Sequence, residues 1–212
     1  MARGFKKKDG RYVARLDAVE RGLVVGLMEQ VRELVAPEQE DAGGGDDDFD
    51  SIVAGLGGIG LGVSLSAADQ APDDDARGLT GDHAEPRDPA LDRIFPTANR
   101  QDEQAAAEFR RLTEETLRTR KTSNLDTALA ALSGVEDQRV TLDREQAVAL
   151  VVALTDVRLV LGERLGLKQD DDLELLEEEV SSLPEDDPAV YALAVYDFLT
   201  WLQETLAKAL QR

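Results

Sequence analysis

The sequence predicts a mainly α-helical protein, a helical bundle of about five helices that begins with an N-terminal β-hairpin. Three observations lead to this fold class. Apolar residues recur every three or four positions in several long segments, which is the period of an amphipathic helix. Asp, Pro and Gly stand at the ends of these segments, where helices begin and stop. An Asp-Gly turn pair separates two short strand-like runs near the N-terminus.

Residues 3–16 are predicted to form the hairpin, with Asp9-Gly10 as its turn. After the turn, apolar and basic residues alternate. This pattern places one set on the core side of the hairpin and the other on its outer side. The inner set is Tyr12, Ala14 and Leu16, and the outer set is Arg11 and Arg15.

The first helix is predicted to begin after Asp17, which forms a capping box with Glu20, and to end before Pro37. Gly22 and Gly26 lie one turn apart on this helix. Because neither has a side chain, we expect a flat strip there that another helix can approach closely.

Five further helical segments follow the first one. A short turn begins at Asp88-Pro89, and a longer pair of helices covers 101–120 and 125–132 with a bend at 121–124. The helix at 101–120 is expected to pack through one side, which carries Ala105, Phe109, Leu112, Thr116 and Leu117. The next helix begins after Asp143, ends at Gly166, and is apolar around most of its circumference. We therefore expect it to be the central helix. The last helix begins at Asp187-Pro188.

The chain divides into three regions by composition. Residues 1–36 hold the hairpin and the first helix, and residues 37–88 are an acidic insert rich in Gly and Asp that we expect to be largely flexible. Residues 89–212 form the main helical core, which contains an acidic link at 167–187 with a helical stretch at 173–180. Within the insert, the uncharged residues 51–68 are candidates for docking on the core.

The net charge of −20 is unevenly distributed along the chain. Residues 37–90 carry −12 and residues 167–188 carry −9, whereas the remaining residues sum to +1. The acidity therefore belongs to the connecting segments, where its ordinary effect is solubility. The chain also lacks Cys, and its first residues do not resemble a signal peptide. We expect a cytoplasmic protein without disulfides that does not bind membranes.

No catalytic, cofactor or metal site is predicted. Residues 55–60 match the glycine spacing of a dinucleotide-binding loop, but acidic residues precede them and no helix follows. The Asp clusters that begin at Asp46 and Asp73 fail the spacing of a calcium-binding loop. His83 is the only histidine and lies in the insert, so neither a catalytic triad nor a zinc site is indicated.

The basic hairpin is the strongest indication of nucleic-acid binding. Its cations are interleaved with Phe5 and Tyr12, a combination that contacts phosphates and stacks on bases. The simpler interpretation, which we prefer, is an edge hairpin protected from aggregation by its lysines. The cations are Arg3, Lys6, Lys7, Lys8, Arg11 and Arg15.

Arg158 lies in the middle of an apolar face of the central helix, so it is predicted to be a buried charge. A buried guanidinium needs an ion pair or several hydrogen bonds. The candidate partners are Glu108 and Asp197, or backbone carbonyls. The functional alternative is an anion-binding site.

The last helix concentrates aromatic residues, and two of them are candidate interaction residues. Its apolar stripe contains Tyr191, while Tyr196 and Trp201 border its polar side. A tryptophan outside the core stripe is either covered by another element or available to a partner.

Three segments resemble an actinobacterial family of uncharacterised proteins, the domain-of-unknown-function family two thousand and seventeen. They are residues 154–166, residues 106–113 and residues 196–203, and the opening hairpin and helix are also similar. The family implies no activity. Its genes often neighbour those of the Clp protease adaptor and of a metal-dependent isopeptidase, which implies a link to regulated proteolysis.

These observations predict a non-catalytic, helical protein-interaction or regulatory protein, accessory to regulated proteolysis. Its partner is expected to be another protein, without a cofactor. The alternative is a nucleic-acid-binding regulator that uses the basic hairpin.

Overall fold

The computed structural model describes residues 2–37, 87–96, 103–135, 137–169 and 171–212, with only the backbone described at 103–108, 110 and 111. The expectations for the insert therefore lie outside the described residues. They concern the flexibility of 38–86, the docking of 51–68, the glycine-rich residues 55–60, the two Asp clusters and His83.

The predicted hairpin is present, and a third strand extends it. Strands β1 (Arg3–Lys8) and β2 (Arg11–Arg15) are antiparallel, and β3 (Arg139–Leu142) pairs with the other edge of β2. The turn residues Asp9 and Gly10 both have positive φ, as this tight hairpin turn requires. The third strand was not predicted because four residues are too few to establish an alternating pattern.

The described chain contains six helices, so the prediction of a mainly α-helical fold is confirmed. The capping boxes predicted at Asp17 and Asp143 are both present, and Gly166 adopts a positive φ just beyond its helix. The helices are α1 (Ala18–Val35), α3 (Pro89–Ile94), α4 (Glu103–Ser133), α5 (Arg144–Arg164), α6 (Asp172–Val180) and α7 (Pro188–Leu210).

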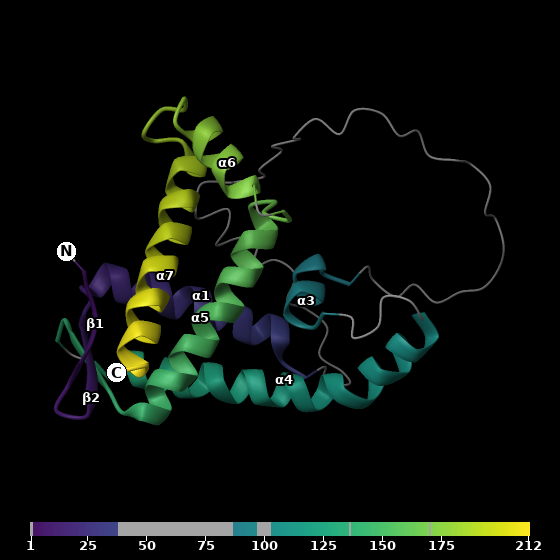
Figure 1. Cartoon of the computed structure of the whole chain (residues 1–212), viewed down its shortest axis with the longest axis horizontal. Coiled ribbons are helices and arrows are strands. Elements are labelled where there is room, and N and C mark those ends of the chain that lie inside the picture. The colour runs from purple at the N-terminus through teal and green to yellow at the C-terminus, as the bar shows by residue number, and fades with distance from the viewer. Residues whose placement is uncertain (1, 38–86, 97–102, 136, 170) are drawn as a thin grey trace.

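Helix α5 is the centre of the fold, as predicted. It packs against α1, α3, α4 and α7, and its N-terminal end also contacts the sheet. The sheet lies at one end of the molecule, close to both termini, whereas α6 lies at the opposite end of α7 (Figure 1). None of the described helices has the length and apolarity needed to cross a membrane.

Two local predictions were wrong. Helix α4 continues through Lys121–Asn124 without the predicted bend, because these residues pack on the body of the molecule as part of one long helix. The strip at Gly22 and Gly26 receives no neighbouring helix, since a Cβ atom added at either position would meet nothing within 4 Å.

Candidate functional site

Arg158 projects from α5 toward α7, where it contacts an amide and a phenol. Its Nη1 donates a hydrogen bond to Gln203 Oε1 at 2.7 Å, and its Nη2 donates one to the hydroxyl of Tyr196 at 3.3 Å. The guanidinium carbon also lies 5.1 Å from the centre of the Tyr196 ring, which allows a cation–π contact. The Gln203 amide nitrogen in turn donates to Thr155 Oγ1 at 2.7 Å.

The prediction of a largely buried Arg158 bonded to a carboxylate or to several backbone carbonyls was wrong. Arg158 is only partly buried, and its described hydrogen-bond partners are neutral. Of the two proposed carboxylates, Asp197 is exposed, and the Glu108 side chain lies outside the described residues. The physical reason is that α7 places neutral acceptors, the Gln203 amide and the Tyr196 hydroxyl, against the guanidinium.

The structure places the two candidate interaction residues on different sides of α7. Tyr196 faces α5 and is engaged by Arg158. Trp201 comes five residues later, about 140° around the helix. It is 38% exposed, and its ring centre lies 6.0 Å from that of Phe198. Tyr191, which was predicted on the apolar stripe, is also exposed. Tyr196 and Trp201 therefore do not form one surface.

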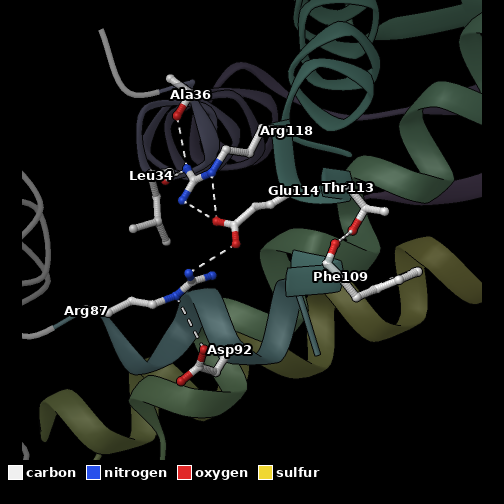
Figure 2. A network of polar contacts seen from close by, with 8 residues as sticks. All are labelled: Leu34, Ala36, Arg87, Asp92, Phe109, Thr113, Glu114 and Arg118. Carbon is white, nitrogen blue, oxygen red and sulfur yellow. Dashed lines mark hydrogen bonds and ion pairs between the residues drawn. The ribbon is translucent and has the colours of Figure 1, made fainter. Parts of the chain in front are cut away.

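A buried polar network on α4 was not predicted from the sequence. Glu114 lies between two arginines (Figure 2). Arg118, one turn later, binds Glu114 Oε1 through Nη2 at 2.8 Å and also donates to the carbonyl of Ala36 at 3.0 Å. Arg87, beside α3, binds Glu114 Oε2 through Nη1 at 3.1 Å and pairs with Asp92 at 3.3 Å. The network therefore ties α4 to the end of α1 and to the start of α3.

This network changes the ionisation of Glu114. Burial raises the pKa of a carboxyl group, but hydrogen bonds from Arg87 and Arg118 outweigh that effect, so the pKa of Glu114 is lowered from its ordinary value of 4.5. Arg118 also stacks over the ring of Phe95, 5.2 Å from its centre. The carboxylate thus stays charged among cations that hold three helical segments together.

A second buried ion pair lies between α4 and α5. Lys121 Nζ is 2.5 Å from Oδ1 of Asp156, a residue with only 1% of its surface exposed. Burial raises the pKa of Asp156, and the hydrogen bond from Lys121 opposes the rise without cancelling it. Its other oxygen, Oδ2, has no hydrogen-bond partner among the described residues.

The orientation of α4 differs from the predicted one. The sequence indicated that its N-terminal half packs through an apolar side that includes Phe109, Leu112 and Leu117. In the structure Phe109 is 53% exposed and Leu112 is 66% exposed, and Leu117 is also exposed. The buried side of this half instead carries Glu114, Arg118 and Lys121.

The sequence does contain a signal for this orientation. The buried apolar residues of the C-terminal half of α4 are Leu125, Ala128 and Leu132. Extending their spacing of three and four residues toward the N-terminus leads to Lys121, Arg118 and Glu114. A single uninterrupted helix therefore buries the charged residues along with the apolar ones. The predicted bend concealed this continuity.

The chemistry of this region is structural in character. Glu114, Asp156 and Glu163 are the described partly or fully buried carboxylates of α4 and α5, and each is held by a cation. Within the described ranges, no group of three or more His, Asp or Glu side chains is placed to hold a metal ion.

Comparison with known proteins identifies a family. The model of a family described as a domain of unknown function, DUF2017, matches residues 2–210. No curated protein and no solved structure matches the chain.

Proposed function

The chain belongs to the DUF2017 family, which supplies no activity, and from its geometry we propose that it is a non-catalytic protein-interaction protein whose docking surface is the outward face of α4. The observation that carries this proposal is the exposure of Phe109 and Leu112 on that face. They are three residues apart, which places both on one side of the helix.

Neighbouring large apolar side chains exposed on one helix face are a feature of protein-binding surfaces. About 150° around the helix from this face, Arg118 is buried and bonded to Glu114 and to the end of α1. The docking face is thus held in place before any partner arrives. Such preorganisation favours binding, because little conformational entropy remains to be lost.

A partner that fits this face presents an apolar groove or helix. Genes of this family are associated with a neighbourhood that includes the gene of the Clp protease adaptor. The first partners to test are therefore components of regulated proteolysis, beginning with that adaptor. In this proposal the chain is accessory to regulated proteolysis and acts by bringing other proteins together.

The test is a binding measurement with the double variant Phe109→Ser/Leu112→Ser, using the purified adaptor and a pull-down from the native lysate. We expect the double variant to lose a partner that the parent protein captures. Leu175→Ser is the matched control, because Leu175 is 54% exposed but lies on α6. This control should bind as the parent does. The thermal unfolding temperature should be unchanged in all variants, since exposed side chains contribute little to the core.

Two outcomes contradict the proposal. If Phe109→Ser/Leu112→Ser lowers the unfolding temperature by several degrees, the face is covered by the chain itself. If Trp201→Ala removes binding while the α4 variant retains it, the docking surface is on α7, where Trp201 is the sequence-predicted candidate.

A further inference from the structure

The outer face of the sheet is strongly cationic. The inner face holds buried residues such as Phe5, Tyr12 and Val140. The three strands contain no Asp or Glu. Exposed cations project from the outer face of all three strands. They are Arg3, Lys6, Lys8, Arg11, Arg15 and Arg139.

The arginines of this face form a row across the strands. Arg15 on β2 lies directly opposite Arg3 on β1 and directly opposite Arg139 on β3. Lys8 likewise opposes Arg11 near the turn. Like charges placed directly opposite each other in a sheet destabilise it. An arrangement of this kind is relieved when a regular array of anions lies on the face.

Protection of the sheet edge does not account for this row. Lysines and arginines on edge strands prevent strands of other molecules from pairing with them. Arg15, however, lies on β2, the central strand, both of whose edges are already paired. The edge interpretation preferred from the sequence therefore covers the cations of β1 and β3 but not Arg11 and Arg15 of the central strand.

The composition of the face indicates which anion fits. A protein partner needs apolar or aromatic anchors, and single-stranded nucleic acid needs exposed aromatic rings for base stacking. The outer face offers neither, since Phe5 and Tyr12 are buried on the inner face and only Val13 is apolar between the cations. Arginine forks are well matched to phosphate groups. We propose that the outer face of the sheet binds the phosphate backbone of duplex nucleic acid.

Asp143, just after β3, pairs with Arg11 of this face at 3.8 Å, whereas the acidic residues of α6 lie far from the sheet. Helix α6 packs against the N-terminal end of α7, around Ala189 and Leu193, whereas Phe5 of β1 bonds to Thr205 near its C-terminal end. These contacts are 12 to 16 residues apart on α7, or roughly 18–24 Å at the rise of an α-helix. The Debye length is about 10 Å at 0.1 M salt, so the acidic side chains of α6 are largely screened from the sheet.

The test uses the full chain and a fluorescein-labelled duplex of random sequence, about 20 base pairs long, in a fluorescence-anisotropy titration at several salt concentrations. If three to five phosphates are contacted, binding should weaken roughly 40- to 500-fold between 50 and 200 mM salt. Arg15→Gln/Arg139→Gln should reduce the slope of log K against log salt by about 1.8, because each lost contact removes about 0.9.

Arg120→Gln is the matched control, since Arg120 is an exposed arginine on α4, away from the sheet. It should leave the slope unchanged, and circular dichroism should show that each variant is folded. The proposal is overturned if no duplex binds at up to about 100 µM protein in 50 mM salt. It is also overturned if Arg120→Gln reduces the slope as much as one sheet substitution does. Displacement of the duplex by polyglutamate at equal charge concentration would show that the face selects acidic protein segments instead.

Discussion

Single buried charges decide how α4 and α5 fit together. Asp156 is almost fully buried, whereas the Lys121 side chain that neutralises it keeps contact with water. The two members of the pair are therefore not equivalent. Removing Lys121 leaves a buried carboxylate without a counter-ion, while neutralising Asp156 leaves a cation that water can still solvate.

We expect Lys121→Met to be clearly more destabilising than Asp156→Asn, with a loss of about 3 kcal/mol in the free energy of unfolding against about 1 kcal/mol. Urea denaturation at neutral pH measures both values.

The pKa of Asp156 is already raised by burial. A group of this kind is protonated in the folded state at a pH where it is still charged in the unfolded state, so its folded-state penalty disappears as pH falls through the raised pKa. The Lys121→Met defect should therefore shrink on acidification, and a defect that grows instead would contradict this assignment.

At the scale of elements, the hydrogen bonds of Arg118 attach α4 to the C-terminal end of α1. Arg118→Ala removes these bonds and leaves Glu114 with Arg87 alone. We expect a loss of about 3 kcal/mol in the free energy of unfolding, measured by urea denaturation. The control is Arg32→Ala, which breaks the exposed pair between Arg32 and Asp126 and should cost less than about 1 kcal/mol. Equal losses from the two variants would mean that burial of the pair is unimportant.

The pH dependence of this attachment has the opposite sign to that of Asp156. The pKa of Glu114 is lowered, so its contribution is complete above the ordinary value of 4.5 and is lost as pH falls through the lowered pKa. In Arg118→Ala this acid-sensitive contribution should be smaller than in the parent protein.

Repulsion between opposed arginines in the sheet gives a further prediction at the scale of elements. Because Arg15 opposes two other arginines, Arg15→Thr should raise the free energy of unfolding by roughly 0.2–1 kcal/mol at low salt. Lys6→Thr is the control, since Lys6 opposes the neutral Val13. The advantage of Arg15→Thr over Lys6→Thr should fade in 1 M salt, where the Debye length is about 3 Å. An advantage that persists in high salt would point to packing instead of charge.

At the scale of the whole molecule, charge and apolar surface are distributed over separate regions. The cationic sheet lies at one end, α6 with its acidic residues lies at the other, and the N-terminal half of α4 extends away from the α5–α7 pair (Figure 1). The two proposed binding surfaces, on the sheet and on α4, therefore do not overlap. A partner protein and a duplex can bind together without competing, so each proposal can fail without affecting the other.

The sequence by itself determined the features that depend on residues close together in the chain. The capping boxes at Asp17 and Asp143 join residues three positions apart, and the Asp9-Gly10 turn joins neighbouring residues. Such contacts form from local backbone geometry, so a pattern in the sequence is sufficient to predict them. The apolar circumference of α5 predicted its central position for a similar reason, since a helix that is apolar all round must be covered on all sides.

Only the tertiary structure decided which side of α4 is buried and what Arg158 binds. Arg118 donates to a carbonyl 82 residues away, and Arg158 bonds to an amide 45 residues away. The sequence pattern of α4 offers two sides, an apolar one with Phe109 and Leu112 and a mixed one with Glu114 and Arg118. The mixed side is buried because α1 and the start of α3 supply the carbonyl groups and the second arginine that satisfy its charges. Burial of a charge is favourable only when such partners are present, and their positions are a property of the whole fold.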